Sequence, residues 1–377
     1  MAKSRLVVEA GPRPRHDVPM GMPIGRAKKA KLTDETTQRV VPCQVVRGEL
    51  CWMLDHIPPG EEKHYLLETG RGSRAGGKAA EATRDGDAVH FFVRGKLFTT
   101  YNFAKDWARP FFYPLYGPEQ TPITRSYPLV DNVPGETTDH PHHKSLWVAH
   151  GDVSGADNWS EEKGHGRQVS RRVKELSDGP VAALLRQDLD WVSNRGKKLC
   201  SEEREVRVYA ASPEERIMDL SVTFKATSRK VTFGDTKEGG LCSVRVATSM
   251  DGNKDGSIEN SYGAIGEDET WGRRAVWCDY SGPVRGKLVG IAVFDTPTNF
   301  RYPTYWHVRD YGLMTANPFG ISYFQPDSGE TGEYTLKAGE QLRFDYRIFI
   351  HLGDASVARV REKYHDYINP PKVTRQR

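Results

Sequence analysis

The sequence predicts an all-β protein, a large antiparallel β-sandwich with a short C-terminal helix. Three observations support this: apolar and polar residues alternate in many segments, Gly- and Pro-rich connections separate those segments, and helical periodicity is scarce. The 377 residues contain no internal repeat and no low-complexity linker. We therefore expect a single domain over residues 1–377.

Strand signals follow one another from residue 89 to residue 351. Residues 288–294 are apolar throughout, which is typical of a strand buried on both faces. The other segments alternate and end at turn residues. The remaining predicted strands are 89–94 and 97–101, which flank Gly95 as a hairpin, 206–210 and 216–226, and two strands within 334–351 on either side of Gly339.

A C-terminal helix and tail are expected over residues 354–377. Asp354 is of a type that caps helices, and prolines at 370 and 371 end the helical pattern. The residues that would form one apolar face, at spacings of three, four and three, are Val357, Val360, Tyr364 and Tyr367.

Charge is distributed unevenly along the chain. There are 54 basic and 50 acidic side chains, a net charge of +4, and the basic excess lies near the N-terminus. We expect residues 1–30 to form a basic segment, with Arg26, Lys28, Lys29 and Lys31 near its end in a solvated loop. The rest of the chain has no basic stripe interleaved with aromatic residues, so nucleic-acid binding is not expected.

Other classes of protein are also excluded. No run approaches the roughly 18 apolar residues of a membrane helix. The first residues lack the apolar core of a signal peptide, so the sequence as written indicates a cytoplasmic protein, although a secreted protein without its signal peptide would look the same. The five cysteines are widely spaced, which argues against a zinc finger or a disulfide scaffold, although a Cys43–Cys51 bridge across a hairpin stays open. No glycine motif for nucleotides and no serine-hydrolase elbow occurs.

Histidines are concentrated in one segment. His140, His142, His143, His150 and His165 lie within 26 residues of the 377. Imidazole transfers protons near neutral pH and binds transition metals. In an extended segment the first two would share a face, which makes them the candidate ligands of a divalent metal. The plain alternative is that each histidine is a structural hydrogen-bonding residue.

Acidic and aromatic residues surround this cluster. Asp139 and Asp152 could orient an imidazole ring. Trp147 and Trp159 offer flat apolar faces of the kind that stack on sugar rings.

Two further groups carry chemically useful side chains. Tyr305-Trp-His-Val-Arg-Asp-Tyr311 places a base, a cation and a carboxylate among three aromatic rings. Glu238 precedes two glycines, with Arg245 nearby, and would put a carboxylate at a strand end near a ligand. An aromatic strand end and an ordinary turn are the respective alternatives.

Together these motifs resemble the PmoA-like family, a bacterial family of unknown function. The methane oxidation that its name suggests does not follow, because this chain has no membrane-spanning run. The stretches that carry the resemblance are Tyr113-Pro-Leu with Gly117-Pro118, Asp139-His-Pro-His-His, His150-Gly-Asp-Val-Ser-Gly, Asp235-Thr-Lys-Glu-Gly-Gly, Trp271-Gly-Arg-Arg, Asp279-Tyr-Ser-Gly-Pro and Pro303-Thr-Tyr-Trp-His-Val-Arg-Asp-Tyr-Gly-Leu.

The resemblance implies a galactose-mutarotase-like β-supersandwich with a carbohydrate on a concave sheet face. By this analogy His143 or His150 would be the acid, Glu238 or Asp310 the base, and arginines would hold hydroxyl or carboxylate groups. The implied catalytic residues are His143, His150, Glu238, His307 and Asp310. The implied substrate-binding residues are Trp147, Asp152, Trp159, Arg245, Tyr305, Arg309 and Tyr311, and His140 and His142 are the candidate metal ligands.

Three functional hypotheses follow. The first is a carbohydrate-active lyase, epimerase or glycosidase that uses His/carboxylate acid–base chemistry on a sugar or sugar-acid glycan. The second is a non-catalytic carbohydrate-binding protein in which the histidines are structural. The third is a metal-dependent oxygenase or hydrolase built on the histidine cluster. The first hypothesis requires His143 and His307 to lie on the same side of the sandwich.

Overall fold

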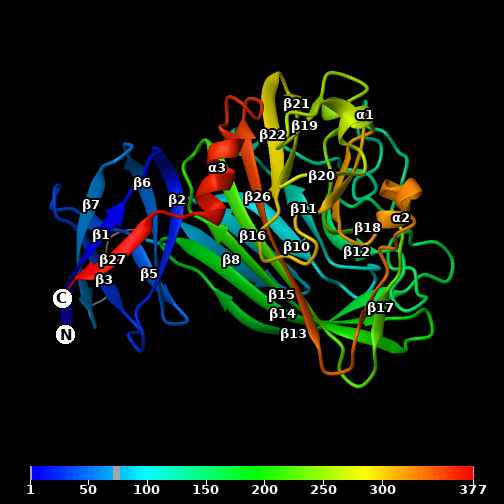
Figure 1. The fold of residues 1–377 in the computed structure, drawn as a ribbon, viewed down its shortest axis with the longest axis horizontal. Coiled ribbons are helices and arrows are strands. Elements are labelled where there is room, and N and C mark those ends of the chain that lie inside the picture. Colours follow the sequence, from blue (N-terminus) through cyan, green and yellow to red (C-terminus); the bar gives the residue numbers. More distant parts are fainter. Residues whose placement is uncertain (1, 71–76, 377) are drawn as a thin grey trace.

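The computed structural model describes residues 2–70 and 77–376, and its regular structure is mostly antiparallel strand (Figure 1). Two large sheets dominate it. In the described residues, Sheet I has nine strands in the order β20-β23-β24-β18-β12-β11-β10-β9-β8, and Sheet II has eight in the order β13-β14-β15-β16-β26-β22-β21-β19. The predicted fold class, a large antiparallel β-sandwich, is confirmed.

The strands of Sheet I are β8 (Ala80–Asp85), β9 (Ala88–Val93), β10 (Lys96–Asn102), β11 (Phe111–Leu115), β12 (Leu146–His150), β18 (Gly239–Arg245), β20 (Arg273–Arg274), β23 (Tyr305–Arg309) and β24 (Leu313–Asn317). Those of Sheet II are β13 (Arg167–Ser177), β14 (Ala182–Val192), β15 (Lys198–Tyr209), β16 (Glu215–Lys225), β19 (Ser257–Asn260), β21 (Trp277–Val284), β22 (Lys287–Phe294) and β26 (Gln341–Leu352).

Apolar side chains from both sheets fill the space between them. Leu146 and Val148 of β12 share one buried cluster with Leu220 and Ile348 of Sheet II. Successive side chains of a strand point to opposite faces, so Trp147 faces away from this core. It joins a smaller aromatic cluster on the outer face of Sheet I.

The predicted strands are present. Residues 89–94 and 97–101 fall in the hairpin β9–β10, and 206–210 and 216–226 fall in the neighbouring strands β15 and β16. Strand β22 lies between two partners, as the apolar run at 288–294 predicts, although Leu288 at its start is exposed. The turn at Gly339 separates β26 from β25 (Tyr334–Leu336), but β25 pairs with β17 (Val231–Phe233) instead of with β26.

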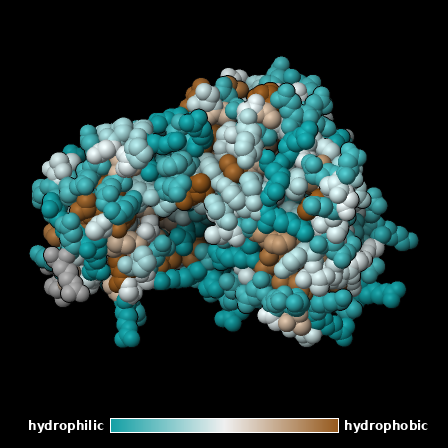
Figure 2. Space-filling model, in the orientation of Figure 1, coloured by the Kyte–Doolittle hydropathy of each residue, from teal (hydrophilic) through white to brown (hydrophobic). Residues whose placement is uncertain are grey.

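The N-terminal residues form a second, smaller sandwich, on the left in Figure 1. Figure 2 shows a hollow between the two sandwiches on a face that is otherwise largely hydrophilic. One small sheet has the order β27-β1-β7-β3-β4 and the other β2-β6-β5. The strands are β1 (Ala2–Glu9), β2 (Arg15–Pro23), β3 (Ala30–Asp34), β4 (Val40–Val41), β5 (Cys43–Val46), β6 (Glu49–Ile57), β7 (Glu62–Thr69) and β27 (Lys372–Gln376).

The basic segment expected over residues 1–30 contains the strands β1 and β2 of this small sandwich. Leu6, Val18 and Leu32 belong to a hydrophobic cluster separate from that of the main sandwich. Arg5 lies between the buried residues Ser4 and Leu6, and Lys31 lies between the buried residues Ala30 and Leu32, so a count of charge did not reveal the buried positions. The exposed turn that contains Arg26 does match the expected solvated loop. The division of the chain into domains stays a prediction.

The C-terminal helix is α3 (Val360–Ile368), which begins later than expected. Asp354 caps a turn, because its carboxylate accepts a hydrogen bond from the amide of Val357 at 2.8 Å. Arg359 then adopts a left-handed conformation with φ +57° directly before the helix. The expected tail is also different, because its residues form β27 and pair with β1.

The remaining elements are short. They are α1 (Gly266–Thr270), α2 (Ile321–Phe324) and 3₁₀ turns at Pro118–Gln120, Thr248–Met250 and Pro326–Ser328. No helix in the described ranges has the length and apolar character needed to cross a membrane. Cys43 and Cys51, which the sequence left open as a bridge, are free thiols.

Candidate functional site

A cavity of about 550 Å³ lies on the outer face of Sheet I. Segments from the His140–His143 turn, residues 157–162, residues 236–238 and strand β23 line it. Eight of the predicted site residues are among the lining side chains: His140, His142, His143, Trp159, Glu238, His307, Arg309 and Tyr311.

Strand register explains why residues far apart in sequence meet here. Trp147 is directly opposite Ser243, which is opposite Thr315, which is opposite His307. Directly opposed residues of antiparallel strands share a face. This row therefore crosses the outer face of Sheet I from β12 to β23.

A second row runs beside the first on the same face. Arg245 is opposite Leu313, and Leu313 is opposite Arg309. The two rows form the floor of the site, and the histidine turn lies over one end of it.

Stacked rings hold the histidine turn. His140 stacks on His143 with centroids 4.8 Å apart, and on Tyr311 at the same distance. His143 in turn stacks on Trp147 at 5.2 Å. His142 meets His143 edge-on at 4.4 Å. The rings thus have fixed positions relative to one another.

Asp139 anchors this turn electrostatically. Its Oδ1 accepts hydrogen bonds from Arg245, at 2.7 Å, and from Arg125, and both guanidinium groups are fully buried. Its Oδ2 lies 2.8 Å from Nδ1 of His140. Burial alone would raise the pKa of Asp139, but Arg245, the hydrogen bond with His140 and Arg125 lower it to about 2. The carboxylate is therefore ionised at neutral pH.

Hydrogen bonds distinguish the two buried histidines of the cavity. Arg245 Nη1 lies 3.3 Å from Nδ1 of His143. Since arginine only donates, this nitrogen is the acceptor, and Nε2 carries the proton of the neutral ring. His307 is the reverse case: its Nδ1 lies 2.8 Å from the carbonyl of Lys237, which can only accept, so Nε2 keeps its lone pair. One ring offers a donor and the other an acceptor.

Both rings are neutral at physiological pH. Burial, followed by the neighbouring His142 and Arg245, holds the pKa of His143 well below its ordinary value. Burial lowers the pKa of His307 to about 3. Burial and Arg109 lower that of His142 to about 3 as well. These histidines can exchange hydrogen bonds with a ligand, but they do not carry a positive charge into the cavity.

Six predicted residues are not among the cavity-lining residues, and three of these are His150, Asp152 and Asp310. His150 packs against Phe233 and Phe319, and its ring nitrogen Nε2 lies 2.9 Å from the carbonyl of Gly234. Asp152 accepts a hydrogen bond from the amide of Gly155 at 2.7 Å in a turn. The third, Asp310, directly follows β23.

The other three lie on the outer face of Sheet I, where the cavity is, but they are not among its lining residues. Trp147 is fully buried under His143. Arg245 is fully buried and holds Asp139. Tyr305 stacks on Phe324 at 5.5 Å, beyond the two rows that form the floor.

Several residues of the site could not be predicted from the sequence. Arg125 is the second anchor of Asp139, and Glu267 of α1 lies 3.1 Å from Arg309. Neither lies in a motif, so only the folded register reveals them. The further lining residues are Gly151, Asp157, Ser160, Glu162, Thr236 and Lys237. Of these, Gly151, Thr236 and Lys237 stand inside the motifs that were singled out.

The expected metal ligands lie close together. The His140 and His142 rings have centroids 5.8 Å apart and meet at 75°. Nδ1 of His140 is already hydrogen-bonded to Asp139. Within residues 2–70 and 77–376, no three His, Cys, Asp or Glu side chains are grouped in a way that could hold a metal ion.

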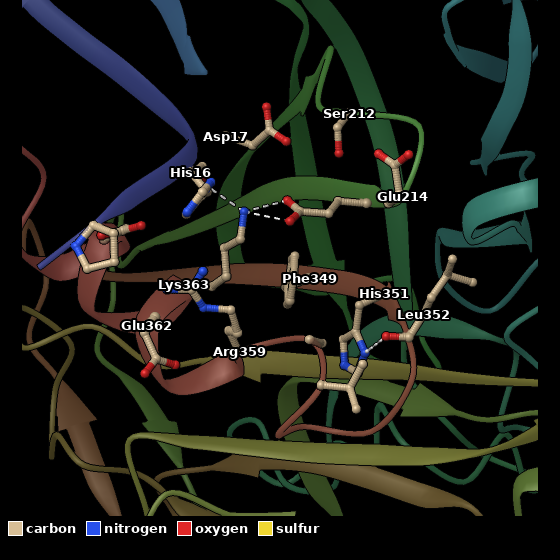
Figure 3. Close-up of a pocket in the computed structure, with 15 residues that line it drawn as sticks. His16, Asp17, Ser212, Glu214, Phe349, His351, Leu352, Arg359, Glu362 and Lys363 are labelled. Carbon is tan, nitrogen blue, oxygen red and sulfur yellow. Dashed lines mark hydrogen bonds and ion pairs between the residues drawn. The ribbon is translucent and has the colours of Figure 1, made fainter. Parts of the chain in front are cut away.

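A second cavity, of about 370 Å³, lies where β2 of the small sandwich meets α3 and β26 (Figure 3). Lys363 extends between the carboxylate of Glu215, at 2.6 Å, and the carbonyl of His16, at 2.9 Å. His351 has acceptors at both ring nitrogens, Asp279 at 2.9 Å and the carbonyl of Leu352 at 3.3 Å. Lys363 and His351 thus already have hydrogen-bond partners within the protein. His143 and His307, by contrast, each leave one ring nitrogen for a ligand.

Comparison with known proteins gives a family but no activity. The model of a family of unknown function (DUF6807) matches residues 88–365, which contain the whole cavity. No curated protein matches the sequence.

Two solved structures align with this chain. A glycosyl hydrolase family 38 protein from Enterococcus faecalis aligns at 11% identity with a TM-score of 0.44, over 100% of this chain and 47% of its own. An alpha-mannosidase from Enterococcus faecalis V583 aligns at 11% identity with a TM-score of 0.46, over 100% of this chain and 46% of its own. This chain thus spans about half the length of these structures.

Proposed function

The chain belongs to this family of unknown function, DUF6807, and we propose from its cavity that it is a carbohydrate-active enzyme. It acts on a sugar or sugar acid by acid–base chemistry of histidine and carboxylate groups. The PmoA-like resemblance and the mutarotase-like analogy point in the same direction and stay predictions.

One observation carries the proposal. His143 and His307, which are 164 positions apart in the sequence, line the same cavity and present complementary nitrogens. Nε2 of His143 donates and Nε2 of His307 accepts, as argued from their Nδ1 contacts. A polyhydroxylated ring carries donors and acceptors on every hydroxyl, so it can engage both nitrogens at once.

The other lining groups fit the same ligand. Arg309 supplies a cation for a hydroxyl or carboxylate oxygen, and Trp159 supplies an aromatic wall. Glu238 is half-exposed and lies 3.1 Å from Lys237, and as a carboxylate it can accept a proton from the ligand. Because His143 is neutral, we assign it the role of hydrogen-bond donor and not that of a charged acid.

Product analysis on a panel of oligosaccharides that includes uronic-acid glycans tests the proposal. The wild type is compared with His143→Ala, His307→Ala and the control His165→Ala, which changes a histidine outside the cavity, each with and without a chelator. We expect a product from the wild type and the control that both cavity variants lose. Its mass separates elimination from hydrolysis, and loss of product in the chelator identifies a metal requirement.

The alternative outcome is equally specific. If no sugar yields a product but one binds saturably, the protein is a carbohydrate-binding protein. If no sugar binds at all, the proposal is wrong.

A further inference from the structure

We propose that His140, paired with Asp139, is the proton-transferring group of this cavity. The proposal rests on the function proposed above and assigns the chemical step to a residue that the sequence had suggested only as a metal ligand. Four features of the structure lead to it.

The first feature is the contact itself. Nδ1 of His140 lies 2.8 Å from Oδ2 of Asp139. An ionised carboxylate only accepts, so Nδ1 carries the proton and Nε2 of the neutral ring keeps its lone pair. Nε2 has no hydrogen-bond partner in the described part of the chain. It is thus the nitrogen available to take a proton.

The second feature is the carboxylate of Asp139, which stays ionised and fixed in place beside the His140 ring. Two fully buried guanidinium groups, from Arg125 and Arg245, hold the other oxygen of Asp139. When His140 takes up a proton, the new positive charge lies beside a carboxylate that is already fixed in place. An orienting carboxylate of this kind sets the tautomer of an imidazole and stabilises the imidazolium.

The third feature is the rigidity of the ring. His140 is stacked on Tyr311 at 12° and on His143 at 6° between ring planes. Its backbone has φ +45°, a left-handed conformation that costs energy for a residue with a side chain, and Pro141 follows it. The fold thus maintains an unfavourable backbone conformation at the position where the imidazole is presented.

The fourth feature is access. The His140 side chain is 39% exposed and lines the cavity, whereas His143 and His307 are 1% and 2% exposed as residues. The low pKa values of the two buried rings also make them weak bases at neutral pH. Of the cavity histidines, His140 combines access with a carboxylate partner.

The proposed step is a reversible proton transfer. Nε2 of His140 takes a proton from a hydroxyl or C–H group of the sugar, and the bonding electron pair stays on the substrate oxygen or carbon. Asp139 remains ionised and compensates the charge of the imidazolium. The same nitrogen then returns the proton to the product or to the leaving oxygen, so that the enzyme regains its initial state.

The experiment has one arm that needs no substrate. In ¹⁵N spectra of the wild-type imidazoles, we expect His140 with a protonated Nδ1 and a bare Nε2. The Asp139→Asn side chain can donate to Nδ1, so this variant should move the proton to Nε2. Modification of His140 by diethyl pyrocarbonate should be fast in the wild type and at least several-fold slower in Asp139→Asn. A protonated Nε2 in the wild type, or a rate that Asp139→Asn leaves unchanged, would overturn the dyad.

The second arm uses any sugar that the protein converts. We expect His140→Gln to lower turnover at least about a hundredfold while it leaves binding within a few-fold, and His165→Gln to keep wild-type turnover. Full turnover by a folded His140→Gln would overturn the assignment. If no sugar is converted, the proposed function fails, but the first arm still decides whether the dyad exists.

Discussion

Glu267 and Arg309 join helix α1 to the floor of the cavity. Oε1 of Glu267 lies 3.1 Å from Nε of Arg309, and its Oε2 accepts a hydrogen bond from the amide of Asp310 at 2.6 Å. One carboxylate therefore fixes both the guanidinium group and the backbone that follows it. The contact with Arg309 is an ion pair and not a hydrogen bond, because Nε of Arg309 has no hydrogen-bond partner in the described residues, so the guanidinium N–H groups remain for a ligand.

Glu267→Gln should weaken ligand binding more than stability. The amide keeps the hydrogen bond to Asp310 but loses the charge that orients Arg309, so we expect the Kd or KM for the sugar to rise roughly tenfold with little change in kcat. Stability should fall by less than about 1 kcal/mol, because both partners are partly exposed. Asp268→Asn, an exposed carboxylate of the same helix, is the matched control. Equal effects of the two variants would contradict the assigned role.

Trp147→Ala should destabilise the protein and abolish binding. The sequence suggested Trp147 as a surface for sugar stacking, but its side chain is fully buried, with His143 at 5.2 Å and Trp159 at 5.6 Å. We expect a loss of about 3–5 kcal/mol, typical of removing a buried tryptophan, measured by urea unfolding. Trp107→Ala, at a side chain that is 36% exposed, should cost much less. A stable Trp147→Ala variant that still fails to bind would restore the stacking role.

Gly151→Ala should disturb the cavity through the backbone. The amide of Gly151 donates to the carbonyl of Glu238 at 2.6 Å, and an added Cβ would lie only 2.5 Å from that oxygen. The segment that must move carries Glu238 itself and the Lys237 carbonyl that orients His307.

We expect this variant to lose about 1–3 kcal/mol, the usual cost of overpacking, together with weaker sugar binding. Differential scanning calorimetry and a binding titration measure the two effects. Gly77→Ala is the control, because nothing lies within 4 Å of its added Cβ. Unchanged binding in Gly151→Ala would show that this segment does not shape the site.

Local sequence patterns were sufficient for six of the seventeen described strands of Sheets I and II: β9, β10, β15, β16, β22 and β26. Strand β16 could be predicted because apolar and polar residues alternate over much of its sequence, although most of its residues are buried, and β22 because its apolar run continues. The small sandwich was missed for a physical reason. Its strands carry basic residues next to buried apolar ones, such as Arg5 beside Leu6 and Lys31 beside Leu32, and a net charge averages over both faces.

The site could be predicted as a set of residue types but not as a set of roles. His140 and His307 could be identified from the sequence because histidine is a rare residue. His140 lies in the histidine-rich segment, and His307 lies near the charged residues Arg309 and Asp310. The distinction between a lining residue and a supporting one depends on which face of β12, β18 or β23 a side chain occupies. That is fixed by long-range register, which a single sequence does not contain. Arg125 and Glu267 act only through partners that are distant in the sequence.

Asp251→Asn should stabilise the protein at neutral pH and not at acid pH. The Asp251 side chain is buried, and its Oδ1 has no hydrogen-bond partner in the described residues. Burial raises its pKa to about 6 despite the opposing charge of Arg245. The folded state therefore binds this proton more tightly than the unfolded state, so the contribution of Asp251 to stability is full below about pH 4 and is lost as the pH rises to about 6.

Asp251→Asn avoids the loss of stability that ionisation of Asp251 causes, because an amide stays neutral at every pH. Urea unfolding at pH 4 should give nearly equal free energies for the two proteins, and at pH 7.5 Asp251→Asn should be more stable by about 1–2 kcal/mol. Asp255→Asn, at an exposed position of the same loop, should show no such pH dependence. A variant that is less stable than the wild type at pH 7.5 would mean that the ionised carboxylate of Asp251 stabilises the buried Arg245 and is not a cost to the fold.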